Sequence, residues 1–284
     1  MLNKKPVKLL AVPALLWLFV LFVVPMLLIV VLSFLNRGTY GQVVYEFTAN
    51  NYIRIFDPLY GQIFGDTFAV AVLTTVLSLL LGYPLSYYIS RLERSRQQIW
   101  LLLVMIPFWI NFLVRSYAWV IILRSQGVVN TVLESLGLIS EPLPLLYNSG
   151  AVLLGMVYTL VPFMVLPIYV SLEQMDRRKL EAAYDLGATP WKALWHVTLP
   201  MTRSGVVTGS ILVFVSSIGM FVVPDVMGGA KSALMGNVIQ NQFLSARDWP
   251  FGSALSIVLM LLSMLLILLY FRAVKAGEAK EGAA

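Results

Sequence analysis

The sequence contains no cysteine and only one histidine, His196, among its 284 residues. Without cysteine, the chain can form neither disulfide bonds nor thiolate metal sites. A single histidine that has no cysteine or second histidine beside it gives no basis for a metal site. No Ser-His-Asp arrangement can be argued from the remaining residues. We therefore expect no catalytic residue, no metal site and no cofactor held by this chain.

Charged side chains are also scarce, at 12% of the residues, whereas an average soluble domain has about 25%. Hydrophobic residues make up 59% of the chain, which leaves too little polar surface for a water-soluble globule of this size. A transmembrane helix needs about 20 mostly apolar residues, and six such runs occur. We predict an all-α polytopic membrane protein with six transmembrane helices, at about residues 9–35, 67–90, 98–123, 145–172, 204–224 and 250–271.

The first apolar run follows Lys4, Lys5 and Lys8, an arrangement that also occurs in secretory signal peptides. Its apolar stretch is longer than the about 7–15 residues of a signal-peptide core, and no small-x-small cleavage site follows it. We therefore predict that this run is a retained membrane anchor.

Basic residues are distributed unevenly between the two sets of loops. The N-terminus, the 91–96 and 173–203 loops and the C-terminal tail hold fourteen lysines and arginines, whereas the opposite loops hold five. Because cytoplasmic loops of membrane proteins carry the excess of lysine and arginine, we predict that both termini face the cytoplasm. This bias also explains the net charge of +6, so no nucleic-acid partner is expected.

The chain reads as a single transmembrane domain, residues 1–284, without a linker or an internal repeat. The expected outer loops are 37–66, 125–141 and 225–248. The inner loops are short except for residues 173–203.

The 176–200 segment has the signals of two short helices joined by a turn. Asp176 is a plausible N-cap of the first helix, and Gly187 is placed to end it. Thr189 and Pro190 then begin a second helix as N-cap and first residue. Ala182 and Ala183 are small, so another surface could approach this helix closely. An alternative is an amphipathic helix that lies on anionic lipid headgroups, and periodicity alone does not separate the two readings.

Three features of this segment resemble the EAA loop of ABC importer permeases: Glu181-Ala182-Ala183, then Gly187, then Leu199-Pro200. In that family, the loop docks into a cleft on the cytoplasmic ATPase. The resemblance therefore implies that the segment couples ATP hydrolysis to transport, through Glu181, Ala182, Ala183, Asp185, Leu186 and Gly187.

The chain is similar over nearly its whole length to the first permease of spermidine/putrescine importers. The matching stretches are Asp57-Pro58-Leu59-Tyr60, Leu81-Gly82-Tyr83-Pro84, Pro107-Phe108-Trp109, Pro162-Phe163-Met164-Val165, Leu180 to Ala188, Asp225 to Lys231 and Arg247 to Gly252. The resemblance implies the type I ABC importer permease fold in a bacterial inner membrane, and polyamine import by alternating access.

The same resemblance implies four kinds of partner: a second homologous permease, two copies of a cytoplasmic ATPase that binds ATP and Mg, a periplasmic or extracellular substrate-binding protein, and membrane lipid. A permease for another small solute in the same family is the alternative. A self-contained secondary transporter is a further one, but it predicts inverted repeats, which we do not find.

A polyamine carries several positive charges, so its path needs acidic groups or aromatic faces. We propose from the sequence that the path includes Trp109, Asn111, Tyr117, Tyr158, Asp225 and Asp248. Arg115 lies within the third apolar run, where an unpaired charge is costly. It either extends to the outer interface or pairs with Asp225, Asp248 or Asp66.

Overall fold

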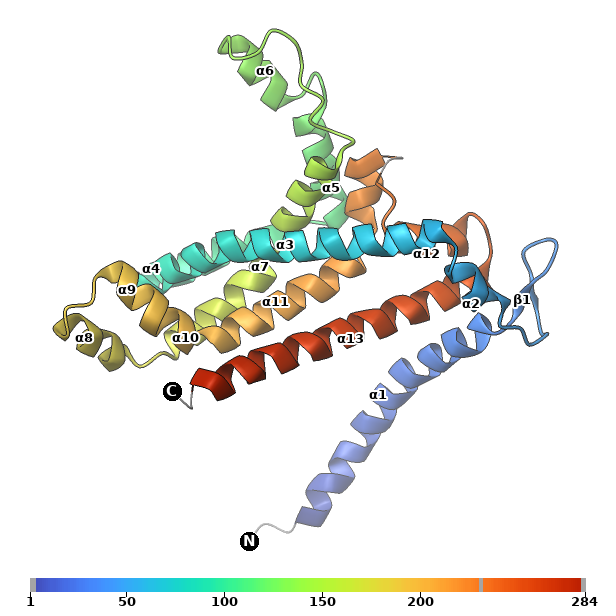
Figure 1. Ribbon diagram of the computed structural model, residues 1–284, viewed down its shortest axis with the longest axis horizontal. Helices are drawn as coiled ribbons and strands as arrows, with labels where there is room; N and C mark the ends of the chain where they lie inside the picture. The colour runs from blue at the N-terminus through green and yellow to red at the C-terminus, as the bar shows by residue number, and fades with distance from the viewer. Residues whose placement is uncertain (1–3, 230–231, 282–284) are drawn as a thin grey trace. The chain divides into compact units, whose positions relative to one another are not determined.

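The computed structural model describes residues 4–229 and 232–281 (Figure 1). Ala230 and Lys231, which belong to the 225–231 stretch matched above, lie outside the described residues. The described chain is almost entirely helical and divides into two compact units. The first comprises Met1–Gln62 together with Val238–Ala284, and the second comprises Ile63–Asn237.

In the first unit, two long helices are joined to a small polar cap. Helix α1 contacts α13 where the two converge beside α2 and a short antiparallel hairpin, and the helices diverge away from that end (Figure 1). The elements are α1 (Lys4–Ser33), β1 (Asn36–Arg37), β2 (Val43–Val44), α2 (Asn50–Ile55) and α13 (Trp249–Glu281). Apart from Asn36, the hairpin and α2 lie within the 37–66 segment, which the sequence predicted only as a loop.

The described surface of α1, over Leu16–Ser33, is apolar and largely uncovered. Only 6% of its Leu16–Ser33 stretch is buried within the protein, although the mean hydropathy of that stretch is 2.9. An exposed surface of this composition is stable only in hydrocarbon or against another apolar helix. The first unit therefore has the surface of a membrane-embedded element.

The second unit holds the remaining helices. Helix α3 begins in the first unit and continues into the second, and α12 crosses the other boundary between the units. The elements are α3 (Pro58–Arg91), α4 (Arg94–Trp109), α5 (Phe112–Leu123), α6 (Val128–Ser135), α7 (Ser149–Glu173), α8 (Arg177–Asp185), α9 (Pro190–Ala193), the π-helical turn η1 (Leu194–Thr198), α10 (Leu199–Met201), α11 (Arg203–Ile218), the π-helical turn η2 (Pro224–Gly228) and α12 (Met235–Leu244).

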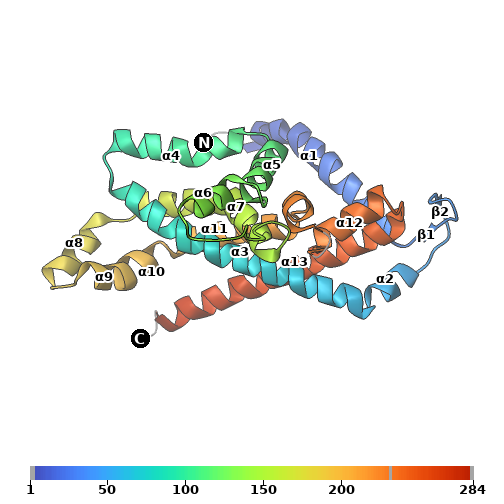
Figure 2. The same cartoon turned by 90° about the horizontal axis from the view of Figure 1, so that it is seen from above.

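The core of the second unit is the pair α7 and α11, which run side by side (Figure 2). Small residues permit the close approach, as is usual for helices packed in membranes. A Cβ atom at Gly205 would lie only 2.6 Å from the carbonyl oxygen of Pro167. Helix α3 joins the pair through Ser86, whose hydroxyl donates to the carbonyl of Val165 at 3.0 Å. These contacts make α7 the central helix of the unit.

One predicted span is bent in the structure, and a second bend lies just before another span. Helix α4 and the following Phe112–Ser135 segment meet at an angle of 93°, so the predicted 98–123 span is broken after Trp109 (Figure 2). The Asn111 side chain accepts from the Leu113 amide at 2.9 Å and starts α5 in a new direction. Residues 190–201 and 203–218 meet at 68°. Among the residues that the structure describes, four helices are long and apolar enough to cross a membrane alone, or up to six spans form if each bent pair is one span. The six-span count stays a prediction.

Candidate functional site

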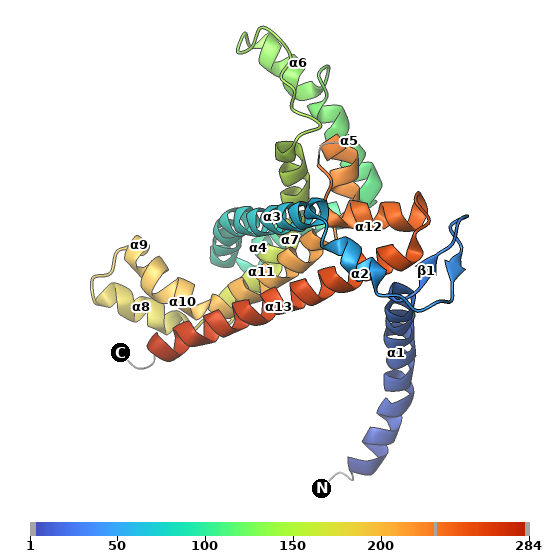
Figure 3. The same cartoon turned by 45° about the vertical axis from the view of Figure 1, so that its right-hand side comes forward.

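The 173–203 loop folds as two short helices joined by a tight turn, as expected from its sequence (Figure 3). Asp176 caps α8 by accepting from the Arg178 amide at 3.0 Å, and Thr189 caps α9 by accepting from the Lys192 amide at 3.4 Å. Gly187 has a φ of +81°, in the left-handed region that favours glycine. Its amide donates to the carbonyl of Tyr184 at 2.9 Å. The starts of α8 and α9 and the turn between them are thus each fixed by a local hydrogen bond.

Helix α8 is attached to the ends of the long helices. Leu180 is buried, and the Arg177 side chain donates to the carbonyl of Ser90 at the end of α3, at 3.5 Å. A cavity of about 170 Å³ lies among the ends of α3 and α7 and the inner side of α8, and Tyr87, Arg91 and Glu181 help to line it. Helix α8 therefore contacts the end of α3 and shares a cavity wall with α7.

The outer side of the loop exposes apolar side chains. Leu186, at the end of α8, is 89% exposed, and Trp191 in α9 is 68% exposed. Trp195 is also exposed and meets Trp191 edge to face, with 6.0 Å between ring centroids. The residues expected from the EAA resemblance, Glu181, Ala182, Ala183, Asp185, Leu186 and Gly187, lie on α8 and the turn, and all but the half-buried Ala183 are exposed. Sequence reasoning missed the two tryptophans, although their spacing of four residues places them on one helical face.

Trp109 and Asn111 line one cavity at the break between α4 and α5. This cavity has a volume of about 400 Å³, and α7 and α11 close it with Thr159, Phe163 and Ser216. The sequence therefore named two neighbouring residues that the structure does place around a common space. Asn111 is there because it caps α5, and Trp109 because it ends α4.

The other residues predicted for the path within this unit lie elsewhere. Tyr158 packs edge to face with Trp119, at 5.4 Å between centroids, and lines a largely apolar cavity of about 870 Å³ between α3, α4 and α7. Tyr117 is exposed on α5. Asp225 is exposed in η2, and no hydrogen bond or ion pair of its carboxylate is found within the described residues.

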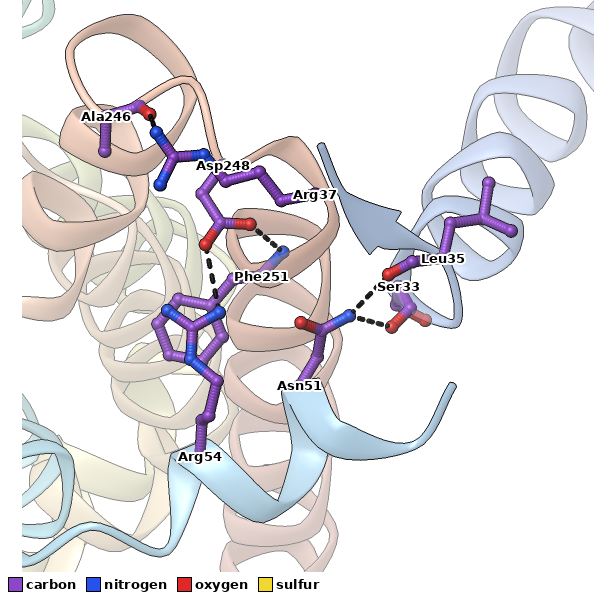
Figure 4. A network of polar contacts seen from close by, with 8 residues as sticks. All are labelled: Ser33, Leu35, Arg37, Asn51, Arg54, Ala246, Asp248 and Phe251. Carbon is purple, nitrogen blue, oxygen red and sulfur yellow. Dashed lines mark hydrogen bonds and ion pairs between the residues drawn. The ribbon is translucent and has the colours of Figure 1, made fainter. Parts of the chain in front are cut away.

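Asp248 belongs to the first unit and lies in a network of polar contacts (Figure 4). It is 2% exposed, accepts from the Phe251 amide at 3.2 Å, and forms an ion pair with Arg54 at 3.0 Å. The Arg54 guanidinium lies over the Phe251 ring, 3.9 Å from its centroid. Asn51 of α2 donates to the carbonyls of Ser33 and Leu35 and so joins the same cap to α1. Both carboxylate oxygens of Asp248 are therefore engaged within the protein.

Arg115 has a different partner from those expected. Its Nη1 donates to the carbonyl of Pro107 at 2.8 Å, and no carboxylate group of the described residues lies within ion-pairing distance of it. The guanidinium lies 5.4 Å from the ring centroid of Phe112 and 5.7 Å from that of Tyr158. The break at Trp109 leaves the last carbonyls of α4 without helical partners, and Arg115 supplies a donor for one of them.

Comparison with known proteins decides what kind of protein this is. The family model described as "binding-protein-dependent transport system inner membrane component" matches residues 7–280. The chain belongs to this family. The permease is accordingly a multi-pass transport subunit of the inner membrane that works with a binding protein.

Two relatives of the permease are named spermidine/putrescine transport system permease protein PotB. The protein from Haemophilus influenzae is 40% identical, and the alignment covers 93% of this chain and 92% of the relative. The protein from Escherichia coli K12 is 41% identical over 90% of this chain and 94% of the relative. A chain of a bacterial ABC transporter that imports the acidic polysaccharide alginate has a similar fold, with a TM-score of 0.72 at 16% identity over 96% of both chains. The permease therefore has the fold of an ABC importer permease.

Proposed function

We propose that this permease moves spermidine and putrescine into the cytoplasm as the membrane subunit of an ABC importer. The observation that carries the proposal is the 40–41% identity, over at least nine-tenths of the chain, to permeases named for these two polyamines. Import of another small solute is the alternative, since the alginate importer has the same fold at 16% identity. The much higher identity to the polyamine permeases favours the first substrate class.

The assembly that we propose contains this chain, a second homologous permease, two copies of a cytoplasmic ATPase and an external binding protein. ATP and Mg are bound by the ATPase. The exposed surface formed by Glu181, Ala182, Asp185, Leu186 and Gly187, with Trp191 and Trp195, supports docking of the loop on the ATPase. The attachment of α8 to the ends of α3 and α7 supports transmission of that movement to the membrane helices.

For the polyamine path, we propose Trp109, Asn111, Tyr117, Tyr158 and Asp225. Trp109 and Tyr117 are exposed aromatic rings, which attract ammonium groups by cation–π contacts. Asp225 carries an exposed carboxylate that makes no ion pair within the described residues, so it is available to an amine. We leave Asp248 out of the path, because Arg54 and the Phe251 amide already occupy its carboxylate.

The test is uptake of labelled spermidine and putrescine by proteoliposomes that contain the complete transporter, with ATP inside and binding protein outside. We expect uptake that needs ATP and that an excess of unlabelled polyamine abolishes. An ATPase subunit inactivated at its nucleotide site is the matched control. Transport of a neutral or anionic solute, with no polyamine uptake, would overturn the substrate assignment and leave the permease assignment intact.

A further inference from the structure

Arg115 is a buried cation whose hydrogen bonding is incomplete. Its side chain is 8% exposed, and its Nε is buried without a hydrogen-bond partner in the described part of the chain. The Pro107 carbonyl satisfies one of the five N–H donors of the guanidinium but supplies no negative charge. A charge at membrane depth is costly unless an opposite charge or several dipoles compensate it.

The cavity beside Arg115 is lined by groups that can donate hydrogen bonds. Thr159, Ser216 and Asn111 line it together with apolar residues, and neither hydroxyl makes a hydrogen bond within residues 4–229 and 232–281. The first turn of α5 also lies on the wall, and the N-terminus of a twelve-residue helix carries a partial positive charge. The donors, the helix end and the guanidinium all favour the same kind of ligand.

We propose that this cavity binds one small anion, a halide or a carboxylate, against the Arg115 guanidinium. An anion there would neutralise the guanidinium charge, so that Arg115 would not repel a polyamine that passes Trp109 and Asn111 on the same wall. Two sources offer this chemistry: chloride from solution, and a carboxylate side chain of the second permease. The site does not depend on which solute the transporter carries.

The binding test uses the assembled transporter in detergent, with iodide as the probe. Iodide quenches tryptophan fluorescence on contact, and Trp109 lines the cavity. We expect a saturable component of quenching that chloride displaces and that is missing from the Trp109→Phe variant. In Arg115→Gln the apparent affinity for iodide should fall about tenfold or more, because an ion pair is stronger in a low-dielectric site than in water. Arg115→Lys should keep part of the affinity, and Arg124→Gln, which removes an exposed arginine at the end of the same helix, should change nothing.

The second arm measures how much of the second permease co-purifies with each variant. No saturable quenching in the wild type, together with loss of the second permease from Arg115→Gln but not from Arg115→Lys, identifies a carboxylate of that subunit as the anion. Arg115→Met replaces Arg115→Gln if the glutamine variant does not insert, since methionine adds no buried donor. Wild-type quenching without a saturable component, combined with normal assembly of the uncharged variant, overturns the proposal. A failure of polyamine uptake would overturn the proposed substrate and leave this site untouched.

Discussion

At the scale of single residues, Gly187 is a position where a substitution would strain the backbone without causing a side-chain clash. A Cβ atom at this position would meet nothing within 4 Å, so only the left-handed backbone, with φ at +81°, opposes substitution. We predict that Gly187→Val costs about 1 kcal/mol or more in the turn and misplaces the exposed face of α8. Binding-protein-stimulated ATP hydrolysis and uptake should fall, while the amount of protein in the membrane stays normal.

A matched control for this prediction exists in the 125–141 segment, which is predicted to be an outer loop. Gly137 has a φ of +71°, and a Cβ there would also meet nothing within 4 Å. Gly137→Val therefore imposes the same backbone strain away from the proposed coupling loop. Equal losses of uptake in the two variants would show that strain, and not docking, is responsible.

Two aspartates in different surroundings give a second residue-scale prediction. Asp225 is exposed and makes no ion pair within the described residues, whereas Asp248 is buried against Arg54. Asp225→Asn should leave thermal unfolding of the purified transporter unchanged and reduce polyamine uptake. Asp248→Asn should lower stability by about 1 kcal/mol, a modest loss because Arg54 is half exposed and water screens the pair.

The measurements are the unfolding temperature in detergent and the uptake rate per assembled transporter. For Asp248→Asn, uptake per assembled complex should remain close to that of the wild type. A large loss of uptake at unchanged stability in this variant would show that Asp248 does belong to the polyamine path.

At the scale of secondary-structure elements, the helix pair α8 and α9 has a buried inner side and an exposed apolar outer side. Leu186→Asp places a charge where we expect a partner surface to cover a leucine, and burying an unpaired charge is unfavourable. We predict about a tenfold or greater loss of affinity for the ATPase, which corresponds to about 1.4 kcal/mol or more. Co-purification of the ATPase with the permease measures it.

Leu138→Asp is the control for this variant, because Leu138 is an exposed leucine in the 125–141 segment, which is predicted to lie on the opposite face of the membrane. Its charge should not affect binding of the ATPase. Unchanged ATPase binding by Leu186→Asp would remove Leu186 from the docking surface. Trp191→Ala, which removes the more exposed of the two paired tryptophans, should likewise weaken binding of the ATPase and is tested by the same co-purification.

At the scale of the whole molecule, the distribution of basic residues predicts the orientation in the membrane. Fourteen lysines and arginines lie in the segments expected inside and five in those expected outside. Fusions of a reporter that is active only in the cytoplasm should be active after residue 186 and at the C-terminus, and inactive after residue 135. The opposite pattern would invert the topology and place the 173–203 loop out of reach of any cytoplasmic ATPase.

The sequence by itself determined the features that depend on residues close together in the chain. The apolar runs show where the long helices lie, since a bilayer imposes their length and composition. The two short helices and their turn could be predicted from Asp176, Gly187, Thr189 and Pro190. Helix ends are fixed by hydrogen bonds that span only a few residues. The motif that first suggested the family also lies within one short segment, residues 181–200. The family match confirmed that the chain belongs to this family.

Only the tertiary structure decided which polar groups meet across long separations. Asp248 pairs with Arg54, 194 residues away, and this pairing depends on how α2 and α13 pack. The sequence predicted residues 98–123 as one span and did not locate the break between α4 and α5, although Pro107 and Asn111 lie beside it. That break brings the Pro107 carbonyl to Arg115, for which the sequence left open either extension to the outer interface or an acidic partner. Burial and pairing of charges are properties of the packed chain, and for this reason sequence reasoning located the charged residues without finding their partners.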